Sequence, residues 1–324
     1  MRRLSPYAFL IGFFLFLFIL LKMVNLGDAW ALLRSVSPFW LALAFLTNLP
    51  EILSKGWRIR RLAALAQSPL SYRHSVWIYL AGQPLSAVTP AKLGDVARVL
   101  GLSRWGHLSW PAAFAVHAAD KVYDLLTLGL LAAVGLIHLV LQSRGQTQTP
   151  AEPALLGIGL GILLMALFLN PKWMRSTVKP VLLFLAPAKL THQIQTHGHE
   201  FYNRLQEQFQ PLPRVVTPFL LSLSAWAMAL LRAYFCSVAL GLPISFLWVV
   251  LLMPIVIVIE FIPISFLGIG TREVALFLFF TAGELTRSGL FCWSQLMLLA
   301  GPLAVSLLGV PAAMKMGTLA AKKT

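Results

Sequence analysis

Two stretches of the sequence put charged side chains beside prolines and glycines within otherwise apolar runs. The first extends from Thr89 to Arg98 and the second from Phe261 to Glu273. At membrane depth, proline and glycine leave backbone N–H and C=O groups without hydrogen-bond partners. Such groups are tolerated only where they face protein or a wet cavity. Ionisable side chains at that depth are costly and usually functional. The two stretches are therefore the first candidates for a ligand site.

The second stretch has residue types that suit a phosphate group. Gly268 and Gly270 let the backbone approach a ligand closely, and Thr271 is a suitable N-cap for the helix that follows. The free N–H groups of a helix start attract anions, and the planar guanidinium of Arg272 fits a phosphate. Glu273 falls in the first turn, where negative charge is favoured. An alternative interpretation is that Arg272 and Glu273 only pair with charges on neighbouring helices.

The first stretch offers the same kinds of residue in the same order. Gly94 precedes Asp95, a predicted N-cap, and Arg98 follows one turn later. We expect Arg98 and Arg272 to hold a lipid phosphate, while Asp95 and Glu273 tune or relay charge. The alternatives for the first stretch are structural ion pairs or a plain polar loop.

Further charged residues lie where they could serve these arginines. Asp120, Lys121 and Asp124 are three or four residues apart, together with His117, and share one face of a predicted helix. They predict a polar wall that pairs with Arg98 or Arg272, or else ordinary helix pairs at the membrane interface.

Two glutamates that end apolar runs could also carry charge within the membrane. Glu51 and Glu260 are candidates for a proton or cation site, with Arg232 as a partner. For Glu51 we favour a capping role at the interface.

The sequence contains no motif that predicts catalysis or a bound metal. His192, His197 and His199 do not have the spacing of a zinc site. A phosphate-binding Walker loop and a nucleophile elbow are also missing. We therefore expect no cofactor, no metal and no enzymatic activity, and the basic residues show no nucleic-acid-binding pattern.

The composition of the chain is typical of a membrane protein. Of 324 residues, 58% are hydrophobic and 11% are charged, whereas soluble domains carry about 25% charged residues. The sequence predicts an all-α polytopic fold with about seven to eight transmembrane helices, of which one or two are Pro/Gly-broken re-entrant segments. The apolar spans and broken segments are expected at 7–24, 38–54, 76–102, 108–141, 153–169, 216–240, 245–259, 261–283 and 290–314.

Basic residues orient the chain. Lys and Arg outnumber Asp and Glu by 26 to 11 and follow several spans, as Lys55, Arg58, Arg60 and Arg61 do. By the positive-inside rule we expect the N-terminus in the cytoplasm of a bacterial cell, with the chain in the inner membrane. The alternative for the first span is a cleaved signal peptide, because Ala29-Trp30-Ala31 resembles a cleavage site.

The domain organisation predicted is one membrane domain over residues 1–324. It could contain two half-repeats, 1–170 and 214–318, because each broken segment follows two hydrophobic spans. A cytoplasmic amphipathic linker, 171–213, would join them, with Phe201, Leu205 and Phe209 on the face that lies on the inner leaflet. For the segment 261–283, charge does not distinguish crossing from re-entry.

At these residues the chain resembles the flippase-like membrane family that includes the transmembrane region of lysylphosphatidylglycerol synthase. The family pattern usually has two adjacent glycines in the last motif, and Leu267 occupies the first of these places. The resemblance covers nearly the whole chain and rests on Pro90 to Asp95 with Arg98, on Asp120 to Asp124, and on Pro263 followed by Gly268 to Glu273.

The resemblance implies movement of a phosphate-bearing lipid, or a lipid-linked sugar, between leaflets. We expect no lysylphosphatidylglycerol synthesis, because no aminoacyl-transferase domain follows the last span. An alternative is a membrane-embedded enzyme or accessory subunit acting on polyprenyl-phosphate-linked sugars or on phospholipids. The expected partners are a membrane lipid, a separate synthase or glycosyltransferase, and a second copy of the chain.

Overall fold

The computed structural model describes residues 8–88, 94–143, 200–211, 213–260, 267–280 and 285–321. Every regular element in these ranges is helical, which confirms the all-α class. The helices are α1 (Ala8–Lys22), α2 (Leu26–Arg34), α3 (Pro38–Leu46), α4 (Asn48–Leu65), α5 (Tyr72–Val88), α6 (Gly94–Trp105), α7 (Trp110–Ser143), α11 (Pro213–Ala239), α12 (Phe246–Glu260), α13 (Thr271–Phe279), α14 (Arg287–Leu298), the π-helical turn η2 (Leu299–Leu303) and α15 (Ala304–Ala321).

Three helical stretches in the described part are long and apolar enough to cross a membrane: 110–141, 213–239 and 287–317. A fourth is possible if α1 and α2, which meet at 92°, form one broken span. The prediction of seven to eight spans is thus supported only for three or four. Other expected spans became shorter helices, since α5 has 17 residues and α12 has 15. The expected span at 153–169 lies outside the described residues.

The basic residues expected in a loop after the second span lie instead within a helix. α4 continues past Ser54 to Leu65, so Arg58 is buried in the interior of the molecule and Lys55 is half-buried. This happens because the segment has good helix formers and no proline or glycine cluster that would end it after Ser54. Arg60 and Arg61, on the other face of α4, are exposed.

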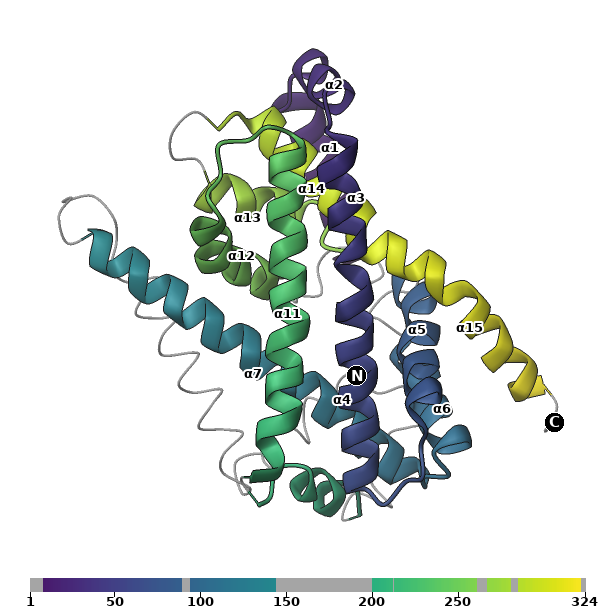
Figure 1. Cartoon of the computed structure of the whole chain (residues 1–324). Helices are drawn as coiled ribbons and strands as arrows, with labels where there is room; N and C mark the ends of the chain where they lie inside the picture. The colour runs from purple at the N-terminus through teal and green to yellow at the C-terminus, as the bar shows by residue number, and fades with distance from the viewer. Residues whose placement is uncertain are drawn as a thin grey trace.

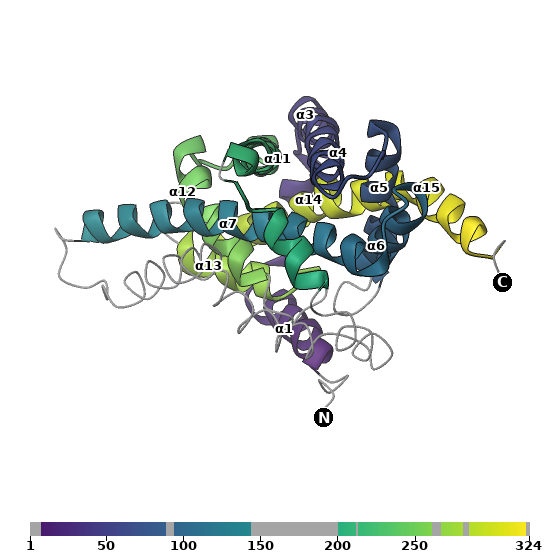
Figure 2. The ribbon, with the colours of Figure 1, turned by 90° about the horizontal axis from the view of Figure 1, so that it is seen from below.

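α4 and α11 pack as an antiparallel pair at the front of the molecule as Figure 1 shows it. α12 packs on α7, and α15 packs on α5. Both views show α7 and α15 extending to opposite sides of the molecule (Figure 2). α6 contacts α5 and α7, while α13 contacts α12 and α14.

The buried side chains form two core clusters. The lower cluster in Figure 1 joins α4, α5, α6 and α7 through residues such as Leu62, Ile78, Leu102 and Tyr123. The upper cluster joins α11, α12, α13 and α14 through residues such as Leu230, Val249, Leu252, Leu276 and Trp293. The two broken segments of the sequence therefore contribute to different cores.

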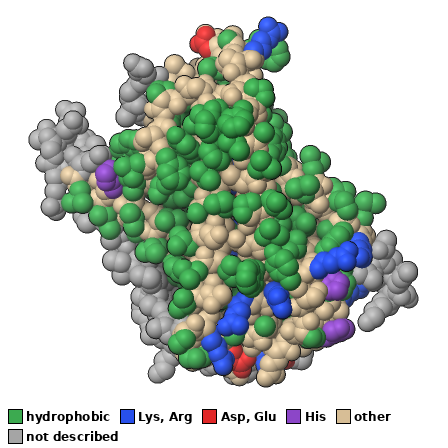
Figure 3. Space-filling model, in the orientation of Figure 1, with side chains coloured by type: hydrophobic (Ala, Val, Ile, Leu, Met, Phe, Trp, Pro, Cys, Tyr) green, Lys and Arg blue, Asp and Glu red, His purple; other side chains and the backbone are tan. Residues whose placement is uncertain are grey.

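The surface fits a protein surrounded by lipid. Hydrophobic side chains cover much of the face shown in Figure 3, and Lys and Arg gather toward its lower end. Exposed aromatic and aliphatic side chains occur on most helices, among them Phe14, Phe39, Leu247, Leu278, Leu307 and Met314. In a soluble protein so much exposed apolar surface would cause aggregation, which indicates that lipid covers it. The basic side chains at the lower end suit contact with anionic headgroups.

The predicted amphipathic helix of the linker is present over residues 200–207, but its apolar face contacts protein. Phe201 and Leu205 are buried in the lower cluster, and Phe209 stacks on Tyr123 with ring centroids 5.2 Å apart. The tyrosine hydroxyl also donates to the carbonyl of Gln208 at 3.2 Å. Burial against α7 therefore replaces the expected contact with the leaflet, and linker residues 171–199 lie outside the described part.

Candidate functional site

The first broken segment forms a tight antiparallel pair, α5 with α6, that depends on two glycines. A Cβ on Gly94 would collide with the carbonyl of Gly82 and with Ser86, and a Cβ on Gly82 would lie 2.6 Å from Arg98 Nε. Arg98 is buried in the space that Gly82 leaves, with Cζ 5.0 Å from the Tyr79 ring centroid. Because α6 begins at Gly94, the predicted N-cap Asp95 lies inside the first turn.

Lys55 of α4 approaches the same tyrosine. Its Nζ lies 5.6 Å from the Tyr79 ring centroid and 5.1 Å from that of Trp226. The nearest carboxylate oxygen, Glu51 Oε1, is 3.5 Å away, longer than the ~2.7–2.9 Å of a charge-assisted hydrogen bond. Tyr79 thus has two cations beside its ring, Lys55 and Arg98.

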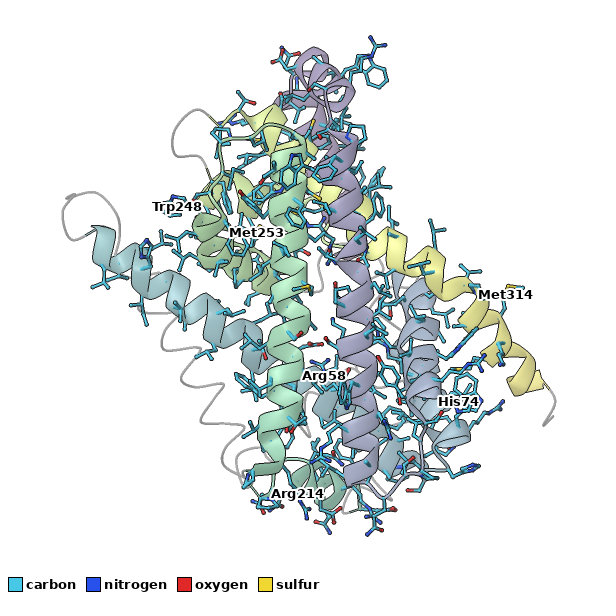
Figure 4. The ribbon with its side chains drawn as sticks, viewed as in Figure 1. Arg58, His74, Arg214, Trp248, Met253 and Met314 are labelled. Atoms are coloured by element: carbon cyan, nitrogen blue, oxygen red, sulfur yellow. The ribbon has the colours of Figure 1, made fainter. Side chains whose placement is uncertain are left out.

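Arg58 pairs with Asp120 and Asp124, the carboxylates that were predicted to pair with Arg98 or Arg272. Its Nε donates to Asp120 Oδ1 at 2.7 Å, and its Nη1 donates to Asp124 Oδ1 at 2.8 Å. Trp226 Nε1 also donates to Asp124, at 3.0 Å. Arg58 lies inside the bundle, well above Arg214 at the lower end (Figure 4). The polar face predicted on 117–124 exists, but its aspartates pair with α4.

Arg232 of α11 is the partner of Glu51, one of the two glutamates to which the sequence assigned it. Its Nη1 donates to Glu51 Oε2 at 2.5 Å and to Asn48 Oδ1 at 2.8 Å. Asn48 Nδ2 in turn donates to the carbonyl of Ala300 in η2, at 2.6 Å. Glu51 is buried, so an internal ion pair replaces the interface cap expected of it.

These contacts make one continuous buried set, which we call the α4 network. Asn48, Glu51, Lys55 and Arg58 recur at helical spacing on one face of α4, and at 1.5 Å per residue they extend over about 15 Å, half of a bilayer core. The network comprises Asn48, Glu51, Lys55, Arg58, Tyr79, Arg98, Asp120, Asp124, Trp226 and Arg232.

Sequence reasoning missed Lys55 and Arg58 because it assigned both to a cytoplasmic loop. Their signal was the spacing of Glu51, Lys55 and Arg58 at i, i+4 and i+7, which aligns all three on one helix face. Lys121 is half-buried beside these groups on α7. The other predicted residue of that wall, His117, is also half-buried.

The second broken segment places Arg272 in a shell of acceptors. Its Nε donates to Glu260 Oε1 at 2.6 Å, and its Nη2 donates to Glu260 Oε2 at 3.3 Å and to the Leu267 carbonyl at 2.7 Å. Its Nη1 donates to the Ser294 carbonyl at 3.3 Å. This geometry matches the alternative interpretation, in which Arg272 pairs with its neighbours.

Glu273 closes the start of α13 from inside. It accepts the Gly270 N–H at 2.6 Å, the Ser294 hydroxyl at 2.6 Å and the Gln295 amide at 2.9 Å. Gly270, with φ +88°, takes the N-cap position that was predicted for Thr271, because this left-handed conformation suits glycine. One N–H that could have met an anion is therefore bound to the helix's own glutamate.

Two neighbouring residues complete the turn before α13. Gly268 has φ +77°, and its carbonyl accepts from the Thr271 hydroxyl at 3.1 Å. Leu267 has φ +52°, which costs a residue with a Cβ about 1–2 kcal/mol. The carbonyl of Leu267 accepts a hydrogen bond from Arg272 Nη2 at 2.7 Å, so Arg272 holds this turn.

The fold, the apolar surface and the buried charges define a multi-pass, all-helical membrane protein. Over residues 7–294 the chain matches the family model described as the lysylphosphatidylglycerol synthase TM region. The chain belongs to this family, as its motifs predicted, which indicates a membrane protein related to lipid modification or transport. A comparison with curated proteins gives no match.

Proposed function

We propose that the protein moves a phosphate-bearing lipid, or a lipid-linked sugar, between the leaflets without changing it chemically. In this proposal the chain lies in a bacterial inner membrane with its N-terminus in the cytoplasm and works on membrane lipid. The observation that supports it best is a correspondence between the two halves of the chain. Inverted repeats that meet at the bilayer midplane are typical of transporters rather than of membrane enzymes.

Residues that pack or pair in one half recur in the other at a constant separation of 174 positions. The corresponding pairs are Arg58 and Arg232, Gly94 and Gly268, Arg98 and Arg272, and Gly135 and Gly309. Each residue pair occupies equivalent elements, on α4 and α11, before or at the start of α6 and α13, within α6 and α13, and on α7 and α15. One separation kept over four different elements favours a repeat over chance placement.

The helices of the two halves also pack in an exchanged manner. Gly135 of α7 lies directly against the carbonyl of Leu251 on α12, so that a Cβ there would collide with it. Gly309 of α15 lies in the same way against the carbonyl of Leu80 on α5. A helix of each half, α7 or α15, thus packs against a helix of the other half, α12 or α5. The antiparallel direction of α4 and α11 indicates that the two halves run in opposite directions (Figure 1).

Helix length supports re-entrant hairpins in both halves. α6 has 12 residues and α13 has nine, which cover about 18 and 14 Å and cannot cross a ~30 Å core. We infer that α5–α6 and α12–α13 enter the membrane from opposite sides. In this proposal the α4 network, which includes Tyr79 of α5 and Arg98 of α6, serves as a polar path for a headgroup, while the acyl chains stay in lipid.

The test is lipid movement in vesicles. Purified protein is reconstituted with phospholipids that carry a fluorescent group on one acyl chain, and dithionite bleaches only the outer leaflet. We expect bleaching beyond one half, at a rate that depends on the headgroup, whereas empty vesicles stop at one half. Correctly folded protein that moves none of a panel of anionic, zwitterionic and sugar-linked lipids would refute the proposal.

A further inference from the structure

We infer that α2 is an interfacial helix, which lies among the lipid headgroups at the upper end of the molecule and inserts one face into the leaflet (Figure 1). That face consists of Leu26, Trp30 and Leu33. The inference does not rest on the proposed transport function, because it requires only that the chain is a membrane protein.

The chain turns sharply between α1 and α2. The apolar helix α1 ends at Lys22, whose side chain is exposed, and α2 leaves at 92° to it. Asn25 caps the new helix, because its side-chain oxygen accepts the N–H groups of Gly27 at 2.9 Å and Asp28 at 3.4 Å. The bend is therefore fixed by a cap, and α2 runs across the direction of α1 instead of prolonging it.

One face of α2 is held on α14. Ala29 is buried in the upper cluster, and Leu32 packs against that cluster. The Asn25 N–H donates to the Ser288 hydroxyl at 3.1 Å. The Cys292 thiol donates to the carbonyl of Ala29 at 3.5 Å. α2 therefore has a defined orientation, and its other faces meet whatever surrounds the protein.

A second face of α2 is apolar and exposed. Leu26, Trp30 and Leu33, at positions i, i+4 and i+7, leave 58%, 58% and 40% of their surfaces exposed. Asp28, two residues after Leu26, lies on the opposite side of the helix and is also exposed. An apolar side and a polar side on one exposed helix are typical of helices that lie in a membrane interface, where tryptophan is also enriched.

The apolar face of α2 continues the surface that lipid covers. Phe14 and Phe18 of α1, before it in the chain, and Phe39 of α3, after it, are exposed. Figure 3 shows acidic and basic side chains at the upper end of the molecule, beyond the apolar surface. This arrangement is the one expected where acyl chains give way to headgroups, so lipid is the occupant that fits this face.

The charges of α2 indicate what holds it in the leaflet. The helix carries one acidic residue, Asp28, and one basic residue, Arg34, whose Cζ lies 4.8 Å from the centroid of the Trp30 ring. Because the two charges cancel, we expect insertion of the apolar face, rather than attraction to anionic headgroups, to hold the helix.

The experiment measures depth with a fluorescent label on an introduced cysteine, in the full chain reconstituted in phosphatidylcholine vesicles. Leu26→Cys and Asp28→Cys place the label on opposite sides of one helical turn, and the unsubstituted chain, whose two cysteines are buried, gives the background. We expect iodide in the water to quench the Leu26→Cys label at least about threefold less than the Asp28→Cys label, because the apolar face of an interfacial helix lies about 5–10 Å into the boundary between headgroups and acyl chains.

Lipids that carry a nitroxide give the depth from the membrane side. A nitroxide on the upper part of an acyl chain should quench the Leu26→Cys label more than a nitroxide at the chain end does. Replacing part of the phosphatidylcholine by phosphatidylglycerol should change neither result.

Other results would overturn the inference. Equal iodide quenching at the two positions would put α2 in water, and stronger quenching by the chain-end nitroxide would put it in the membrane core. A Leu26→Cys label that neither iodide nor a nitroxide reaches would show that protein covers the face. Protection from iodide only in vesicles with phosphatidylglycerol would show that charge holds the helix.

A further substitution tests the tryptophan itself. In the Leu26→Cys chain, Trp30→Glu should raise iodide quenching at least about twofold, because a carboxylate is costly below the headgroups. Ala31→Glu, at an exposed position outside the apolar face, is the matched control and should leave the quenching unchanged. Unchanged quenching in folded Trp30→Glu would overturn the insertion of Trp30. The comparison of Leu26→Cys with Asp28→Cys tests the inference even if Trp30→Glu does not fold.

Discussion

Arg98 and Arg272 occupy corresponding places in α6 and α13, yet their surroundings differ. Arg272 donates to Glu260 and to two backbone carbonyls, and it anchors the turn before its own helix. Arg98 lies over Gly82 beside the ring of Tyr79, with a second cation, Lys55, on that ring. The same arginine position thus stabilises a turn in one half and packs on a tyrosine ring in the other.

The difference extends to the total charge around each arginine. Near Arg272 one cation meets two carboxylates, Glu260 and Glu273, and Glu273 is also stabilised by three uncharged donors. Near Arg98 the described contacts are with the ring of Tyr79, which a second cation, Lys55, also approaches. The upper motif is therefore satisfied by its own neighbours, although both motifs look suited to phosphate.

The largest effect is expected from removing the Arg272 side chain in the upper cluster. Arg272→Ala leaves the Glu260 carboxylate and the Leu267 carbonyl without their donor, and we expect a loss of about 3–5 kcal/mol of stability. The thermal unfolding midpoint in detergent and the yield of monodisperse protein measure this. The exposed control Arg287→Ala should change stability by less than about 0.5 kcal/mol. An unfolding midpoint equal to the wild type would contradict the structural role of Arg272.

The next effect tests the exchanged packing that relates the two halves. Gly135→Val and Gly309→Val each push a side chain into a neighbouring backbone carbonyl, with an expected cost of about 2–3 kcal/mol. Gly129→Val, at a glycine of α7 with open space around it, is the control. Similar losses of thermal stability in the first two variants support the correspondence. A loss confined to one of them would argue against it.

Arg98→Gln should act on lipid movement more than on stability, in contrast to Arg272→Ala. We expect transport to slow about tenfold, because a charged donor to the phosphate is lost. The rate of dithionite bleaching in vesicles measures it, alongside the unfolding midpoint. If instead Arg98→Gln unfolds the protein and keeps the rate per folded molecule, the two arginines have the same structural role.

The smallest effect is a gain in stability. Leu267→Gly relieves a left-handed residue at the turn that Arg272 holds, and should raise stability by about 0.5–1 kcal/mol. Leu278→Gly, in the last turn of α13, should lower it by up to about 1 kcal/mol. The unfolding midpoints of the two variants therefore move in opposite directions. A lower midpoint for Leu267→Gly would show that the leucine side chain contributes more than its backbone costs.

Much of the fold could be predicted because apolar runs and helix-breaking residues are local signals. The long helices α7 and α11 begin and end close to their predicted bounds for this reason. α13 begins at Thr271, within one residue of the predicted start, since Thr271 was predicted as the N-cap and Gly270 takes that place. The number of membrane crossings was harder to predict, since an apolar run of 15 residues such as α12 can be a short span or half of a hairpin.

The candidate site was predicted less well, because ion pairing is decided between helices. Asp120 and Asp124 were identified as functional carboxylates, but nothing local specifies Arg58 rather than Arg98 as their partner. Arg232 with Glu51 was one of two pairings that the residues allowed. Glu260 and Arg272, 12 residues apart, could be paired only once α12 and α13 were placed together.

The sequence by itself determined the membrane class, the family and the positions where charge enters the apolar core, because hydropathy and glycine or proline placement act along the chain. Only the tertiary structure decided which charges neutralise one another. Coulombic attraction in a medium of low dielectric depends on separations of a few ångströms between atoms on different helices. That is why Arg272 pairs with Glu260 of α12, while Arg58 of α4 pairs with Asp120 and Asp124 of α7.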